Sequence, residues 1–130
     1  MAMARRPLSP YWIYRFAYTM ALSILHRATG LALSAGLVLL VAWLVALASG
    51  AECYALFQGF AGSWPVRLLI AAGVLAFCYH LANGIRHLLW DLGVGLERAE
   101  ARRSAGIVIV VALLMTAALL WLFFCPGGAS

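Results

Sequence analysis

The sequence predicts an all-α membrane protein with three transmembrane helices. Of its 130 residues, 66% are hydrophobic and only 10% are charged, and the mean hydropathy is +1.00. A soluble domain of this size needs a larger share of polar surface. Three long apolar runs, each near the roughly 20 residues that cross a bilayer, are separated by short polar segments. We therefore expect a single membrane domain over residues 1–130.

Residues 1–20 precede the first predicted span. The prolines of Arg6-Pro7-Leu8-Ser9-Pro10 exclude a regular helix there. The aromatic residues Tyr11, Trp12, Tyr14 and Tyr18 are typical of a belt at the membrane interface, with Arg15 among the headgroups. No short apolar segment ends in a cleavage site, so a signal peptide is not expected.

The three helices follow in order. The first is predicted over about 21–49, and a loop with the helix breakers Gly59, Gly62, Ser63 and Pro65 comes after it. The second is predicted over about 66–91, because glycines follow Asp91 closely. We expect the charged segment 97–103 to be a loop, and the third helix to run over about 105–124.

All nine basic residues are arginines, and their distribution predicts the orientation. Eight of the nine lie before the first apolar core or around the second loop, and Arg67 alone lies on the other side. Positive residues favour the cytoplasmic side, so we expect the N-terminus there and the C-terminus on the periplasmic side. Orientation explains these arginines more simply than nucleic-acid binding does, and no nucleic-acid partner is expected.

The three cysteines have no metal-ligand spacing and no CxxC pair. Cys78 lies in an apolar helix, where a small buried residue is the ordinary role. Cys53 and Cys125 are expected near the same membrane face. Nothing in the sequence brings them together, so a disulfide between them stays open.

Polar residues form a stripe along the second helix. His80, Gly84, His87 and Asp91 follow at offsets of four, three and four, which places them on one helix face. Arg86 lies about 120° away from that line. A polar stripe in a membrane helix must face another helix, a cofactor or water rather than lipid.

The first helix carries a matching set at the same predicted membrane face. Ser23, His26 and Arg27 occupy positions i, i+3 and i+4. Two antiparallel helices would bring these three to one level with Arg86, His87 and Asp91. A hydroxyl, a fixed cation and a carboxylate at that level are suited to binding a quinone carbonyl and delivering protons to it.

His80 lies about 16 Å deeper than Asp91, near the middle of the bilayer. Its imidazole could hydrogen-bond a neighbouring helix or bind a metal. Gly84 leaves a flat surface beside it, which suits a close-packed helix or a porphyrin. We expect no other histidine of this chain at that depth, so a second haem ligand would have to come from a partner subunit.

Two motifs carry a resemblance that spans nearly the whole chain. The first is Arg6-Pro7-Leu8-Ser9-Pro10 followed by Ser23-x-x-His26-Arg27-x-Thr29-Gly30, and the second is His80-x-x-x-Gly84-Ile85-Arg86-His87-Leu88-Leu89-Trp90-Asp91-x-Gly93. With these motifs in this order, the sequence resembles the cytochrome b subunits of succinate dehydrogenase, the larger membrane anchor of succinate:quinone oxidoreductase. A small departure is Tyr11-Trp12, where the family often has a histidine and an aliphatic residue.

The resemblance implies half of a heterodimeric, haem-binding helix bundle. It implies that His80 is the axial ligand to haem b, with the other ligand from the smaller anchor subunit. His26, Arg27 and, more weakly, His87 would lie near the haem propionates, while Ser23, Arg27 and Asp91 would help form the ubiquinone site. The implied partners are the flavoprotein and iron–sulfur subunits, which oxidise succinate and pass on its electrons, so the chain would not be an enzyme by itself.

Three alternatives remain at this stage. The same scaffold serves the anchor of a fumarate reductase or of another quinone oxidoreductase, with or without haem. A pore is disfavoured because the third helix offers only Thr116 as a polar residue.

The expected location is the bacterial inner membrane, or the mitochondrial inner membrane if the chain is a mature form.

Overall fold

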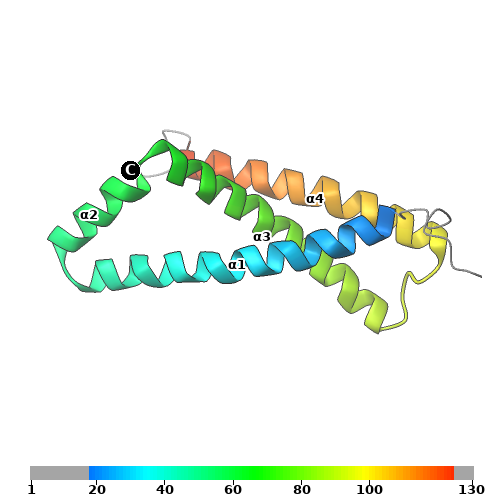
Figure 1. The fold of residues 1–130 in the computed structure, drawn as a ribbon. Helices are drawn as coiled ribbons and strands as arrows, with labels where there is room; N and C mark the ends of the chain where they lie inside the picture. Colours follow the sequence, from blue (N-terminus) through cyan, green and yellow to red (C-terminus); the bar gives the residue numbers. More distant parts are fainter. Residues whose placement is uncertain (1–17, 125–130) are drawn as a thin grey trace, which may run out of the picture.

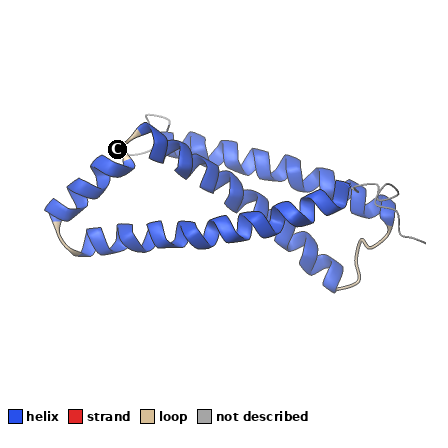
Figure 2. Cartoon of the chain, viewed as in Figure 1, coloured by secondary structure: helices blue, strands red, loops and turns tan. Residues whose placement is uncertain are grey.

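The computed structural model describes residues 18–124, and these residues form four helices joined by short loops (Figures 1 and 2). The helices are α1 (Tyr18–Ala48), α2 (Ala51–Ala61), α3 (Trp64–Asp91) and α4 (Arg98–Phe124). Three of them, α1, α3 and α4, are long and apolar enough to cross a membrane. The predicted all-α membrane fold with three spans is therefore confirmed.

The loop predicted after the first span is wrong, because most of it forms α2. Its sequence begins with good helix formers, and its breakers Gly59 and Gly62 fall only at its end. Gly50, with φ +105°, lets the chain turn between α1 and α2. With 11 residues α2 is too short to span a bilayer. Pro65, in the first turn of α3, suits the start of that helix.

The predicted start of the third helix is also wrong. Helix α4 begins at Arg98 rather than near residue 105, and the carbonyl of Glu97 accepts its first hydrogen bond from the amide of Ala101, at 2.8 Å. The charged segment consists of Glu, Arg and Ala, which are strong helix formers. The charged residues therefore mark the boundary of the apolar membrane-spanning part, but the helix itself begins several residues earlier. The starts of α1 and α3, at Tyr18 and Trp64, differ from the predictions by only a few residues.

Helix α4 packs along α3, whereas α1 crosses α3 and then diverges from it (Figure 1). The small buried core lies where all three meet, and consists of Leu22, Cys78, Tyr79, Ala105, Val108 and Ala112. The phenol of Tyr79 donates a hydrogen bond of 2.7 Å to the carbonyl of Leu22, which ties α3 to the start of α1. The α1–α3 crossing therefore lies near the end of the bundle where α1 begins, α3 ends and α4 begins. That end carries Arg27, Arg98, Arg102 and Arg103 and is called the arginine-rich end below.

Toward α2, helices α1 and α3 separate around an apolar cavity of about 780 Å³, which is lined mostly by their Ala, Leu and Gly residues. Most of the large apolar side chains of the three spans are exposed in the isolated chain. Such a surface needs lipid or further helices to cover it. Cys53 is exposed in α2 and forms no disulfide with the other described cysteine, Cys78. Of the predicted aromatic belt, Tyr18 is described and lies exposed at the start of α1. Its other members, at residues 11–15, and Cys125 lie outside the described residues.

Candidate functional site

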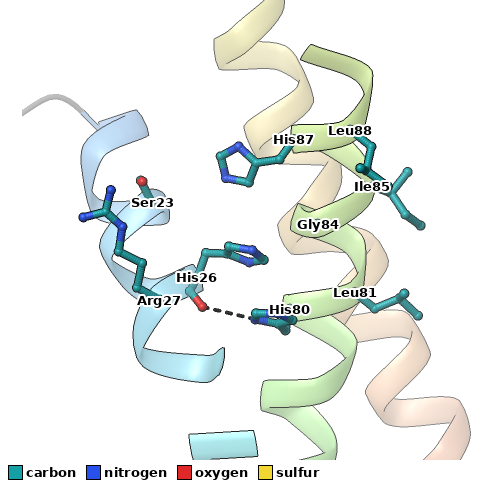
Figure 3. A pocket seen from close by; sticks show the side chains of 9 residues that line it. All are labelled: Ser23, His26, Arg27, His80, Leu81, Gly84, Ile85, His87 and Leu88. Atoms are coloured by element: carbon teal, nitrogen blue, oxygen red, sulfur yellow. Dashed lines mark hydrogen bonds between the residues drawn. The ribbon is translucent and has the colours of Figure 1, made fainter. Parts of the chain in front are cut away.

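A cavity of about 610 Å³ opens at the α1–α3 crossing, near the arginine-rich end (Figure 3). It is lined by three residues of α1 and six of α3: Ser23, His26, Arg27, His80, Leu81, Gly84, Ile85, His87 and Leu88. Five of the six residues predicted from the sequence to bind quinone or haem lie here. The cavity is therefore the candidate functional site.

The imidazole of His80 is held by α1 through one of its two nitrogens. Its Nδ1 lies 3.1 Å from the carbonyl oxygen of His26 and 3.2 Å from Oγ1 of Thr29. A carbonyl can only accept, so Nδ1 carries the proton and donates it. In a neutral imidazole the other nitrogen, Nε2, then keeps its lone pair. A histidine that donates from one nitrogen to a carbonyl has the usual arrangement of a metal ligand.

His26 lies directly against His80, which corrects one expectation. The two rings are stacked with centroids 4.0 Å apart and planes 10° from parallel. The prediction that the chain has no other histidine at the depth of His80 is therefore wrong. The ring of His87 is tilted against His26, with centroids 5.1 Å apart. Among the described residues, Nδ1 of His26 is buried and has no hydrogen-bond partner.

Two glycines make this close approach of α1 and α3 possible. A Cβ built on Gly30 of α1 would lie 3.0 Å from Cε1 of His80. One built on Gly84 of α3 would lie 3.7 Å from Cε1 of His26. Each helix therefore offers a glycine to the histidine of the other. Gly84, predicted to provide a flat surface, is covered by the His26 ring.

These two glycines differ in a testable way. Replacing Gly30 by alanine places a methyl group against a ring that hydrogen bonds hold in place, whereas the alanine at Gly84 makes an ordinary contact. Overpacking costs about 1–3 kcal/mol, and the change from Gly to Ala in a helix otherwise gains about 0.5–1 kcal/mol. We expect the Gly30→Ala protein to unfold at a lower temperature in detergent than the wild type, and the Gly84→Ala protein not to. Equal midpoints for the two variants would contradict this packing.

Ser23 and Arg27 lie on the α1 side of the cavity. Ser23 is half-buried and Arg27 is exposed, and its side chain extends back along α1 toward the level of Ser23 (Figure 3). Neither side chain has a hydrogen-bond or ion-pair partner among residues 18–124. Within the described part of the chain, both polar groups are therefore unoccupied by other side chains.

Asp91 is not brought to the cavity by this chain. It is the last residue of α3, it is exposed, and it is absent from the lining. Helix α3 continues past its crossing with α1, so its end lies away from the crossing (Figure 1). The role predicted for Asp91 in a quinone site stays a prediction.

Arg86 faces away from the cavity, toward α4, and is 4% exposed. Arg86 lies at the level of the cavity, between the lining residues Ile85 and His87, but on a different helix face, in agreement with its predicted 120° offset from the His80 stripe. It belongs to a second polar stripe, Tyr79, Asn83, Arg86 and Trp90, whose offsets are again four, three and four. Sequence reasoning missed Tyr79, Asn83 and Trp90, although the repeated spacing was a usable signal.

Comparisons with known proteins identify the family of the chain. Residues 3–119 match the family described as the succinate dehydrogenase/fumarate reductase transmembrane subunit. The chain is 37% identical over 120 residues to the succinate dehydrogenase cytochrome b556 subunit of Paracoccus denitrificans, covering 92% of each chain. It is 41% identical over 119 residues to the mitochondrial succinate dehydrogenase cytochrome b560 subunit of Mus musculus, covering 89% of this chain and 70% of that one.

A further relative is the succinate dehydrogenase cytochrome b556 subunit of Rickettsia felis. It is 38% identical over 118 residues, which cover 90% of this chain and 91% of the relative. The relatives include bacterial and mitochondrial proteins, and the matches span all three long helices. The chain therefore belongs to the family of succinate dehydrogenase/fumarate reductase transmembrane subunits, among the cytochrome b subunits of succinate dehydrogenase.

Proposed function

We propose that this chain is the larger membrane anchor of succinate dehydrogenase, that it binds haem b through His80, and that it contributes Ser23, Arg27 and Asp91 to a ubiquinone site. One observation carries the proposal. The Nδ1–H of His80 is committed to the carbonyl of His26, which leaves Nε2 free to bind iron. The cytochrome b names of the relatives support haem as the group that His80 binds.

The residues around His80 fit a haem better than a bare metal ion. The described residues contain no group of three or more His, Cys, Asp or Glu that could hold an ion. A haem needs only axial bases from protein, because the porphyrin supplies the other ligands. Nδ1 of His26, buried and without a partner among the described residues, and the polar groups of Arg27 and His87 are suited to haem propionates.

The second axial base is proposed to come from the smaller anchor subunit. A metal binds in the plane of an imidazole, along the nitrogen lone pair. The rings of His26 and His80 are stacked and nearly parallel, so their lone pairs do not point at one iron from opposite sides. His26 is therefore not suited to the sixth position, although it lies at the right depth.

Ser23 and Arg27 are proposed to bind a quinone carbonyl. Their hydroxyl and guanidinium lie on the same side of the cavity and are free of partners among the described residues. A guanidinium stabilises the negative charge that develops on a quinone oxygen during reduction, and the hydroxyl is a hydrogen-bond donor to it. A bound haem would supply a one-electron store beside this site. Asp91 is the last residue of α3 and lies outside the cavity lining, so it would contribute to the quinone site from its edge.

The arginine-rich end is proposed to face the cytoplasm or the mitochondrial matrix, in the bacterial or mitochondrial inner membrane. Arg27, Arg98, Arg102 and Arg103 lie there, whereas Arg67 lies near the opposite end. The iron–sulfur and flavoprotein subunits would dock on this basic surface. The second candidate is the anchor of a fumarate reductase, because the matching family covers both enzymes.

Purification of the tagged chain in mild detergent tests the proposal. We expect three further subunits to co-elute: the flavoprotein subunit, the iron–sulfur subunit and a second, smaller membrane anchor. The reduced-minus-oxidised spectrum should contain a b-type haem band. A colourless complex would contradict the haem assignment, and elution of the chain alone from a membrane with intact respiratory complexes would contradict the anchor assignment. Succinate oxidation at a much higher rate than fumarate reduction would favour succinate dehydrogenase over the second candidate.

A further inference from the structure

Arg86 is a buried cation whose polar partners among residues 18–124 are all uncharged. Its Nε–H donates to Oγ of Ser104 at 3.0 Å, one Nη1–H to Oδ1 of Asn83 at 3.2 Å, and one Nη2–H to the carbonyl of Ala101 at 2.9 Å. Its Cζ lies 4.0 Å from the ring centroid of Trp90. No carboxylate of residues 18–124 forms an ion pair with it. The guanidinium therefore has no direct counter-ion among the described residues.

The surroundings of Arg86 are built to satisfy a cation. Asn83 is fully buried, and its Oδ1 accepts from Arg86 while its Nδ2 finds no partner among the described residues. The opposite orientation of this amide would set two donors against each other, because arginine has no acceptor. An unsatisfied buried donor costs stability. The amide of Asn83 thus leaves its Nδ2 without a partner among the described residues in order to accept a hydrogen bond from Arg86. This orientation indicates that the side chains here are arranged around the positive charge.

The charge lies close to the candidate site without touching it. Arg86 is not part of the cavity lining, but its sequence neighbours Ile85 and His87 are. The guanidinium and the cavity are thus on different faces of one helix, which is about 10–12 Å across with its side chains. Coulomb interactions fall only with the inverse of distance, and mobile ions do not screen them inside a membrane protein as they do in water.

We propose that Arg86 is a fixed positive charge that raises the midpoint potential of the haem bound at His80. The proposal rests on the haem binding proposed above. Reduction adds one electron to ferric iron, delivered through the iron–sulfur subunit, and lowers the charge of the haem by one. A nearby uncompensated cation therefore stabilises the reduced haem more than the oxidised haem. Arg86 acts through its field and is not a catalytic residue.

A redox titration of the haem band in the purified complex tests this proposal. For Arg86→Gln we expect the equilibrium constant for reduction to fall at least tenfold, which equals 59 mV for one electron. Arg86→Lys keeps the charge and should stay much closer to the wild type. The matched control is Arg67→Gln, which removes an exposed arginine at the opposite end of α3 and should leave the potential unchanged.

A second variant neutralises the charge without removing the arginine. Ser104→Asp places a carboxylate next to Nε of Arg86 and preserves the contact with Trp90. We expect Ser104→Asp to lower the midpoint potential of the haem, as Arg86→Gln does. If the Arg86 variants fail to assemble, this variant alone tests whether the charge sets the potential.

Unchanged potentials in Ser104→Asp and Arg86→Gln complexes that retain the haem band would overturn the proposal. An equal fall in Arg86→Lys and Arg86→Gln would also overturn it, since packing rather than charge would then be responsible. A wild-type complex without any haem band would instead refute the proposed function.

Discussion

Replacing His80 by leucine is expected to remove or alter the b-type haem spectrum of the assembled complex. The substitution deletes Nε2, the nitrogen proposed to bind the iron, which keeps its lone pair because Nδ1 donates to the carbonyl of His26. Loss of a hydrogen bond behind a ligand typically costs about 10–100-fold in metal affinity. Loss of the ligand itself should cost at least as much. The measurements are haem content per complex and the reduced-minus-oxidised spectrum.

Two control variants separate ligation from folding. Thr29→Val removes only one of the two groups near Nδ1 of His80, so it should retain the haem with a small change in potential. Ser34→Ala removes an exposed hydroxyl of α1 that donates only to the carbonyl of Gly30 and lies outside the cavity, so it should also retain the haem. If His80→Leu kept both an unaltered spectrum and an unaltered midpoint potential, His80 would not be the ligand.

The three spans were predictable because membrane insertion depends on local properties of the sequence. A run of about 20 apolar residues must form a helix in a bilayer, since its backbone groups have no other partners there. The ends of the helices were less predictable. The glycines and the proline near residues 59–65 suggested a loop where α2 forms, and the charges at 97–103 suggested a loop where α4 begins. Both predictions failed because neither feature prevents a helix from forming in water or at an interface.

The candidate site was predictable one helix at a time. The offsets along α3 place His80, Gly84 and His87 on one face, and the structure brings all three to the cavity. The relative level of α1 and α3 was not predictable, because it depends on how the two helices cross. The approach of Gly30 to His80 and of Gly84 to His26 sets that level.

The same reasoning accounts for Arg86 and Asp91. Helix periodicity separates Arg86 from the His80 stripe, but only packing shows that α4 and Ser104 lie on its side. Asp91 was placed at the cavity by assuming that antiparallel helices end at one level. Because α1 and α3 cross, α3 extends past the cavity before it ends. An angle between two helices is a tertiary property that a single sequence does not display.

Replacing Arg27 by leucine is expected to lower quinone reduction by about 10–100-fold while succinate oxidation with an artificial acceptor continues. Arg27 lines the cavity, is exposed and has no partner among the described residues, so its loss should leave the helix packing intact. A hydrogen bond to a charged group contributes about 1.5–3 kcal/mol, and every 1.4 kcal/mol corresponds to a factor of ten. Steady-state assays with ubiquinone and with a soluble dye measure the two activities.

Ser23→Ala should act in the same direction as Arg27→Leu but more weakly, because it removes a neutral hydrogen-bonding group of the same cavity. Arg67→Gln is the matched control, since it removes an exposed arginine that lies outside the cavity and at the end of the bundle opposite the proposed docking surface, and it should preserve both activities. If Arg27→Leu lowered the two activities equally, the arginine would support assembly of the complex. If quinone reduction were unaffected in both cavity variants, the electrons would reach quinone at a site that α1 does not form.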